Sequence, residues 1–197
     1  MRSLFLKAFF ALFVVLLGAV FFWQPLSATF SNTSITNDFI LQTAYGTLDS
    51  KSLRGKVLAI FFGPTNCGAP CTDQIAKLAQ AREALNAGER SQVMVILITV
   101  DPERDTPVRM GEYARSLHAD FVGASGKPEE IKAVADAFSA DFAKRMLQDG
   151  SYVVEARPLT YLVDTNGRFV SVLNENLSAA KVAEALRARL PKMLPPG

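Results

Sequence analysis

The chain is poor in the residues from which catalytic and metal sites are most often built. Its 197 residues include only two cysteines, one histidine and one tryptophan. A lone histidine is weak evidence for a metal site, because such sites collect several ligands. The sequence also lacks a Gly-rich phosphate-binding loop and a nucleophilic serine motif, which argues against the chemistry that depends on either.

The chain also lacks a large excess of positive or negative charge. The formal net charge is +2, and two of the positive residues, Arg2 and Lys7, precede or interrupt the first apolar run. The remainder of the chain is therefore neutral, and no basic surface points to a nucleic-acid partner. A chain of this length buries a full core without disulfide cross-links, so the two cysteines are not required for bulk stability.

One long apolar run is present, from Leu4 to Trp23. About 20 helical residues rise about 30 Å, which matches the hydrocarbon core of a bilayer. Residues 1–23 therefore predict an N-terminal transmembrane helix, with the positive residues in the cytoplasm and the rest exported. The alternative is a cleaved signal peptide, although Leu26 occupies a position before the candidate cleavage site at Ala28 that should be small.

Either alternative exports the rest of the chain to a compartment where thiols are not kept reduced by default. Residues 24–36 are rich in Ser, Thr and Asn and predict a tether. Residues 37–190 then form one folded domain, and residues 191–197 are a tail.

Within this domain, two continuous apolar runs at 57–62 and 93–100 predict buried central strands. Helices are expected at 70–87, ended by Gly88, and at 106–117, 128–138 and 179–190. Shorter strands are expected at 121–122, 152–154, 160–163 and 169–172, with an Asn166-Gly167 hairpin turn between the last two. This order predicts an α/β fold with a mixed central sheet flanked by helices and a terminal hairpin.

Both cysteines fall in residues 62–71, which join a buried strand to a helix. Sites of open α/β sheets lie at the carboxyl ends of strands, and the first turn of a helix stabilises an anion. We therefore expect Cys67 to be a nucleophile with a lowered pKa, and Cys71 to lie close enough to resolve a mixed disulfide. A plain structural disulfide or two inert thiols is the alternative, but the placement favours a redox or metal role.

Four segments carry a resemblance to a known family: residues 55–57, the Phe-Gly-x-Thr-x-Cys-x-x-x-Cys segment at 62–71, TVDPERDTP at 99–107 and YLVDxxG at 161–167. On these the chain, from about 38 to 190, resembles the Sco/SenC family. These are membrane-anchored, thioredoxin-fold proteins implicated in delivering copper to cytochrome c oxidase. The resemblance implies a thioredoxin-like fold and a domain that faces the periplasm from the bacterial inner membrane. The charges within TVDPERDTP suggest a structural or docking role rather than catalysis.

The resemblance also implies a copper site made by both cysteines and one histidine. The family's histidine position falls on Ala156, which cannot coordinate a metal, and Gly68-Ala69 stands where the family has an aspartate. The only histidine, His118, ends the helix predicted from Thr106 and is interpreted as a helix-end residue. Two thiolates without imidazole suit Cu(I) and not Cu(II), so the chain has a Cu(I) site or no copper site.

Residues 157–164 resemble a second pattern, the Pro-x-x-Phe-Leu-Ile-Asp segment of TlpA/ResA-type thiol reductases. In that family the proline is cis and faces the redox cysteines. We therefore predict that Pro158 is a cis proline near the cysteines; the alternative is a trans proline at the start of a strand. Glu155 is expected near the cysteines, where its charge would raise their pKa.

Three functions remain in order of preference. The first is a thiol–disulfide oxidoreductase that needs no cofactor, in which Cys67 attacks and Cys71 resolves. Its partner is an exported protein with thiols or a disulfide, such as a copper-site subunit of cytochrome c oxidase or a copper chaperone. The second is a Cu(I) metallochaperone that uses Cys67 and Cys71 with a third ligand from outside the chain. The third is a degenerate scaffold with a structural disulfide.

Overall fold

The computed structural model describes residues 37–191. The predicted membrane helix at 1–23, the tether at 24–36 and all but the first residue of the tail lie outside these residues. From 37 to 191, the helices are all too short or too polar to cross a membrane.

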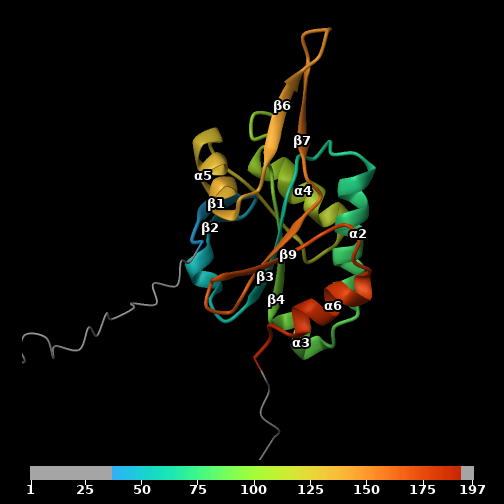
Figure 1. Ribbon diagram of the computed structural model, residues 1–197. Helices are drawn as coiled ribbons and strands as arrows, with labels where there is room; N and C mark the ends of the chain where they lie inside the picture. The colour runs from blue at the N-terminus through green and yellow to red at the C-terminus, as the bar shows by residue number, and fades with distance from the viewer. Residues whose placement is uncertain (1–36, 192–197) are drawn as a thin grey trace, which may run out of the picture. The chain divides into compact units, whose positions relative to one another are not determined.

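The domain is built on a mixed sheet of seven strands in the order β2-β1-β5-β4-β3-β8-β9 (Figure 1). The strands are β1 Ile40–Thr43, β2 Gly46–Asp49, β3 Val57–Phe62, β4 Val93–Ile98, β5 Val122–Ser125, β8 Thr160–Val163 and β9 Phe169–Leu173. The three central strands, β3, β4 and β5, are parallel, and the outer strands pair antiparallel to their neighbours. The predicted mixed α/β sheet with a terminal hairpin is confirmed.

Helices cover both faces of this sheet, because the side chains of its buried central strands alternate between two cores. Odd-numbered residues of β3 pack with three helices, and even-numbered ones pack with a fourth helix on the other face. The first group is α2 Ala69–Glu83, α4 Pro107–Leu117 and α6 Ala179–Arg187, and the fourth helix is α5 Pro128–Phe138. In Figure 1, α5 lies to the left of the sheet, and α2 and α6 lie to its right.

Several predicted boundaries were wrong. The first long helix ends at Glu83, and Gly88 does not stop it but lies inside a short helix, α3 Ala87–Ser91. Asn86 and Glu89 form a reciprocal capping box there, and this start signal outweighs the glycine. A short 3-10 helix, η1 Ser50–Leu53, was also not predicted. The helices predicted from Thr106 and Pro128, by contrast, are confirmed.

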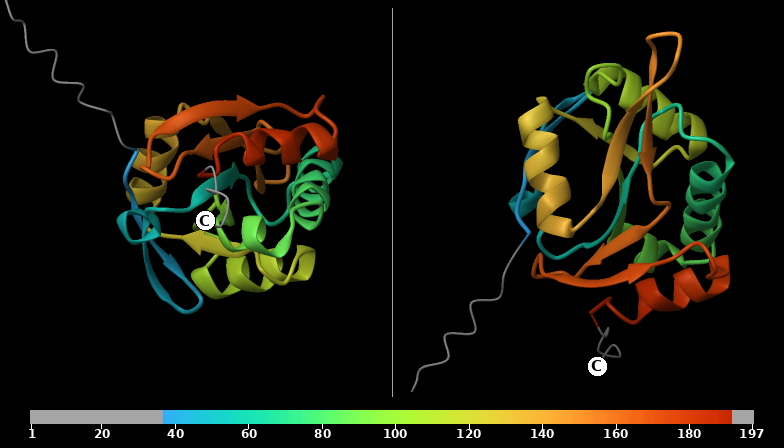
Figure 2. Two further views of the ribbon diagram at one scale, coloured as in Figure 1. Left: turned by 90° about the horizontal axis from the view of Figure 1, so that it is seen from below. Right: turned by 45° about the horizontal axis from the view of Figure 1, so that its top comes forward.

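Two further strands form a separate hairpin, β6 Phe142–Met146 with β7 Tyr152–Ala156, which projects from one end of the domain (Figures 1 and 2). Only β7 was predicted. Most of β6 is exposed on both faces, so its sequence shows no alternation of apolar and polar residues.

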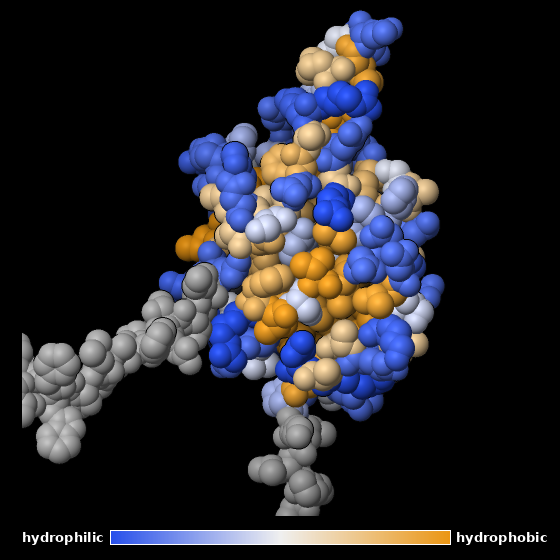
Figure 3. Space-filling view, in the orientation of Figure 1, coloured by the Kyte–Doolittle hydropathy of each residue, from blue (hydrophilic) through white to orange (hydrophobic). Residues whose placement is uncertain are grey.

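Strand β9 forms one edge of the main sheet and leaves Phe169 and Val172 about two-fifths exposed, at 39% and 42%. An apolar area is visible over this strand in Figure 3.

Candidate redox site

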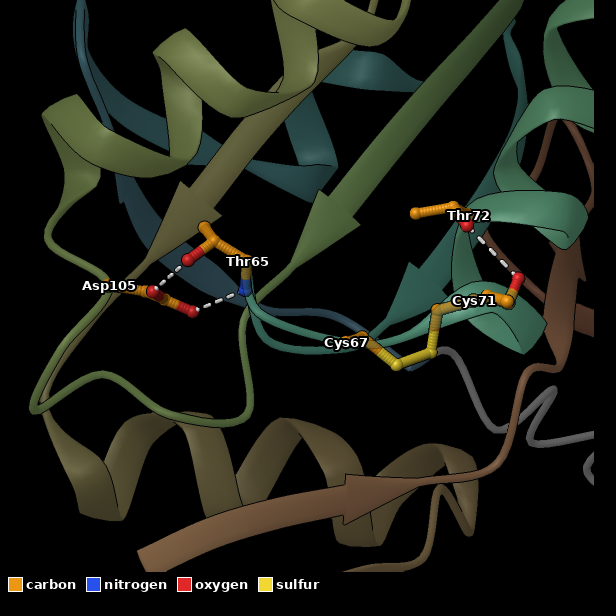
Figure 4. The surroundings of a disulfide bond; sticks show 6 residues. Thr65, Cys67, Cys71, Thr72 and Asp105 are labelled. Atoms are coloured by element: carbon orange, nitrogen blue, oxygen red, sulfur yellow. Dashed lines mark hydrogen bonds between the residues drawn. A yellow bond between two sulfur atoms is a disulfide. The ribbon is translucent and has the colours of Figure 1, made fainter. Parts of the chain in front are cut away.

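The two cysteines lie where the sequence placed them, Cys67 in the loop between β3 and α2 and Cys71 in the first turn of α2. A disulfide joins Cys67 to Cys71, with 5.8 Å between their Cα atoms (Figure 4). Gly68 is the N-cap of α2, and Pro70 lies in its first turn, where the missing N–H costs no helical bond. The Cys71 N–H donates to the Gly68 carbonyl over 3.1 Å. The pair is therefore held at the N-terminus of a helix, where backbone N–H groups and the helix dipole favour negative charge.

The two sulfur-bearing residues differ in exposure. Cys71 is 1% exposed and belongs to the core formed with α4 and α6, whereas Cys67 is partly buried and packs against that core. An external thiol or disulfide therefore reaches Cys67 before Cys71.

We call residues 63–68 the cysteine loop. One buried carboxylate, that of Asp105, holds it to the sheet. Asp105 is 2% exposed and accepts hydrogen bonds from the Thr65 N–H at 2.8 Å and the Thr65 hydroxyl at 2.6 Å (Figure 4). It also accepts a hydrogen bond from the Thr99 hydroxyl at 2.7 Å. The Arg109 guanidinium lies 3.5 Å from the same carboxylate and balances its charge. A buried carboxylate with this many donors fixes the loop in one position.

Residues 101–105, the segment that ends at Asp105, also hold the β6–β7 hairpin through their contacts with Tyr152. The Tyr152 hydroxyl donates to the carboxylates of Asp101 and Glu103, each over 3.0 Å. Its ring lies between two cations, with Arg104 at 3.9 Å and Lys144 at 3.8 Å from the ring centre. Burial and the two carboxylates raise the pKa of Tyr152 to about 12. Residues 101–105 thus contact the cysteine loop at one end and the hairpin at the other.

Pro158 lies two residues before β8, at the end of the sheet where β3 ends, because Thr160 pairs with Phe61. From residue 37 to 191 all peptide bonds are trans, so the prediction of a cis proline is wrong. The Leu159 N–H donates to the Arg157 carbonyl over 2.8 Å, which closes a three-residue turn around Pro158. Such a turn needs a φ close to the one that the proline ring fixes, so the trans form fits without help from the cysteines.

Ala156 is the last residue of β7 and pairs with Phe142. It packs against the core on the α5 side of the sheet, whereas both cysteines pack against the other core. Glu155, expected to influence the cysteines, instead forms an ion pair with Arg145 at 2.7 Å on the exposed hairpin.

His118 is the C-cap of α4, which confirms its interpretation as a helix-end residue. Its Nε2 lies 2.8 Å from Glu83 Oε1, and its Nδ1 accepts the Asp120 N–H at 3.2 Å. The hydrogen bond from His118 lowers the pKa of Glu83. Glu83 is the last residue of α2 and Cys71 lies in its first turn, so the histidine is about 18 Å away along the helix axis.

Between residues 37 and 191, no group of three or more acidic, cysteine or histidine side chains is arranged so that it could hold a metal ion. The two cysteine sulfurs, which could act as metal ligands, are bonded to each other in the disulfide.

The family model described as SCO1/SenC matches residues 27–191. This chain belongs to the SCO1/SenC family. A SCO2-like protein of Rickettsia conorii is 32% identical over 159 residues, which cover 79% of this chain and 77% of that protein. ScoI of Bradyrhizobium japonicum, solved with copper bound, is 35% identical with a TM-score of 0.71 and covers 79% of this chain and 99% of that one. Apo Sco1 of Thermus thermophilus is 32% identical with a TM-score of 0.72, covering 79% and 91%.

These comparisons confirm both the resemblance to Sco/SenC proteins and the thioredoxin-like α/β fold. The roles of Asp105 and Tyr152 were not found from the sequence. The density of carboxylates after β4 was a signal for a structural segment, but their partners lie 40 and about 50 residues away along the chain.

Proposed function

We propose that this SCO1/SenC protein is a membrane-anchored thiol–disulfide oxidoreductase of the periplasm that acts in assembly of the copper site of cytochrome c oxidase. One observation carries the proposal. The partly buried Cys67 and the buried Cys71 form a disulfide at a helix N-terminus, while the only histidine of the sequence is held at the other end of that helix. The site therefore has the parts needed for disulfide exchange and lacks an imidazole for a three-ligand copper site.

The exchange follows from the difference in exposure between the sulfurs. In the reduced protein the Cys67 thiolate attacks one sulfur of a partner disulfide, whose S–S bond breaks and whose leaving sulfur takes a proton. Cys71 then attacks Cys67 Sγ, which releases the second partner sulfur as a thiol. The partner gains two electrons and two protons, and this protein is left with the Cys67–Cys71 disulfide. A partner subunit with copper-binding cysteines would thereby be reduced before it takes up the metal.

Helix geometry supports the assignment of Cys67 as the attacking sulfur. It lies directly before the N-cap of α2, where the free N–H groups and the positive end of the dipole stabilise a thiolate. The buried Cys71 is reached only from Cys67, as a resolving residue requires.

A Cu(I) metallochaperone is the second candidate. It is favoured by the copper-bound ScoI of Bradyrhizobium japonicum, which is 35% identical to this chain. After reduction, Cys67 and Cys71 offer two thiolates, which suit soft Cu(I) but not Cu(II). A donor from outside the chain would have to complete the site.

Trapping of the mixed disulfide tests the first candidate. Full-length Cys71→Ser protein, expressed in bacterial membranes, should accumulate a disulfide-linked partner through Cys67. The Cys67→Ser/Cys71→Ser double variant is the matched control and should trap nothing. No trapped partner, together with a reduction potential below about −300 mV, would show a structural disulfide instead.

Titration of the reduced protein with Cu(I) against a competing chelator separates the two candidates. Stoichiometric binding that is lost in the double variant, without any trapped partner, would support the metallochaperone. Trapped partner with weak or no Cu(I) binding would support the oxidoreductase.

A further inference from the structure

Gln74 lies three residues after Cys71 in α2 and is one of the few polar side chains that are fully buried. It is 0% exposed, and its Nε2 donates to the Thr160 hydroxyl over 3.1 Å. Its other polar atom, Oε1, has no hydrogen-bond partner among the residues that the structure describes. A buried amide oxygen without a donor is destabilising, so its retention needs an explanation.

Helix geometry places this side chain beside Cys71. Gln74 follows Cys71 by three residues in α2, and both belong to the buried stripe of that helix. Side chains in helices lean toward the N-terminus, over the residue three or four positions earlier. The bond to Thr160, on β8, fixes the Nε2 end of the amide, so Oε1 points in a different direction from the Thr160 hydroxyl.

We propose that Gln74 is a positioning residue whose Oε1 accepts a hydrogen bond from the Cys71 thiol when the pair is reduced. This inference rests on the proposed oxidoreductase function. In the disulfide the Cys71 sulfur carries no hydrogen, so the oxygen is left without a donor. Reduction by an external dithiol breaks the S–S bond, transfers two electrons from that dithiol, which becomes a disulfide, and places a proton on Cys71. The new S–H then satisfies Oε1, and the reduced form gains a contact that the oxidised form lacks.

A merely structural role for Gln74 gives a different result. If the amide only joins α2 to β8 through Thr160, it stabilises the oxidised and reduced proteins equally. The equilibrium between these two forms would then not depend on Gln74, even though both forms would lose stability without it.

The test is the equilibrium constant for reduction of full-length protein in glutathione buffers. Gln74→Met keeps the length of the side chain and removes its polar atoms, and we expect the constant to fall about five- to tenfold. A tenfold fall corresponds to a shift of about 30 mV to more negative potential. Gln80→Met, on the exposed side of the same helix, is the matched control and should leave the constant unchanged.

Gln74→Glu provides a rescue and guards against misfolding of the methionine variant. A buried glutamic acid is protonated, so it offers an O–H to Thr160 and a carbonyl oxygen to Cys71. We expect its constant to stay within about twofold of the wild type. An unchanged constant in Gln74→Met, or an equal fall in Gln74→Glu and Gln74→Met, would overturn the inference.

This failure is distinguishable from failure of the proposed function. Trapping of a partner by Cys71→Ser depends on Cys67 and not on a thiol at position 71. If trapping persists while the Gln74 variants leave the constant unchanged, the function stands and the role of Gln74 is wrong. If Cys71→Ser traps nothing, the function itself is wrong.

Discussion

The cysteine loop and the β6–β7 hairpin are both held by residues 101–105, but by different chemistry. The loop is fixed by the carboxylate of Asp105, which is 2% exposed and accepts three hydrogen bonds. The hairpin is held by the ring and hydroxyl of Tyr152 and by an ion pair between Lys144 and Glu103, whose side chains are 43% and 55% exposed. Buried charge-assisted bonds are strong, whereas exposed ion pairs contribute little and are screened by salt.

The difference indicates that the reactive loop is the rigid part of this surface and that the hairpin opens at lower cost. A rigid loop keeps Cys67 in place at the helix N-terminus. A hairpin held in part by exposed contacts opens without disturbing the cysteines. Four variants test this comparison.

The largest effect is expected from Asp105→Ala. This change leaves the part-buried Thr65 donors and the buried Thr99 hydroxyl without their acceptor, so the free energy of unfolding should fall by about 3–4 kcal/mol in urea titrations. The rate at which reduced Cys67 is alkylated should also change in this variant, because Asp105 no longer holds the cysteine loop. Asp141→Ala, at an exposed aspartate, should cost less than about 0.5 kcal/mol. A loss of less than about 0.5 kcal/mol in Asp105→Ala would refute the interpretation that the cysteine loop is rigid.

Ala156→His tests whether the hairpin brings this position to the cysteines. If it does, the added imidazole completes the ligand set that the family resemblance implies, and affinity for Cu(II) should rise about a hundredfold. Competition with a Cu(II) chelator measures this change, and a thiolate-to-copper absorption band should appear only in the variant. Gln148→His, at an exposed residue beyond the end of β6, is the control. Equal affinities for Cu(II) in the two variants would mean that residue 156 lies too far from the cysteines to share a metal ion with them.

Tyr152→Phe should loosen the hairpin and leave the cysteine loop intact. Loss of the two bonds from the hydroxyl should lower amide-exchange protection in β6 and β7 about tenfold, without changing protection in α2.

The phenol of Tyr152 also stabilises the fold in a pH-dependent way. Its pKa is raised from 10.0 to about 12, so this contribution is complete below pH 10 and is lost as the pH rises through about 12. The variant should lack this loss of stability at alkaline pH. An equal fall in amide-exchange protection in α2 would contradict the conclusion that the two regions are held separately.

The smallest effect is expected from His118→Asn. It should leave the reduction potential and Cu(I) binding unchanged, because His118 lies at the far end of α2. The pKa of Glu83 is lowered from 4.5, so its contribution to stability is present above that pH and is lost as the pH falls through the lowered value. The variant should therefore lose less stability in acid than the wild type. A change in Cu(I) affinity would instead show that the histidine reaches the cysteines.

Local pattern was enough for the strand that leads into the cysteine loop and for the helix that begins after Asp105. The apolar run of β3 and the cap at Thr106 are visible within a few residues of sequence, and both were predicted correctly. Strand β6 was missed because it has no buried face of its own. The isomer of Pro158 was predicted wrongly because a resemblance to another family outweighed the local turn.

The sequence by itself determined that a buried strand places Cys67 just before a helix and Cys71 in its first turn, because hydrophobic periodicity and helix-start signals act over short distances. Only the tertiary structure decided which side chains surround that pair. The parallel pairing of β3 with β4 brings the segments that follow them together, so Asp105 meets Thr65, and the antiparallel pairing of β8 with β3 brings Thr160 to Gln74. Such contacts join residues far apart in the chain, and they depend on strand order, which no local pattern encodes.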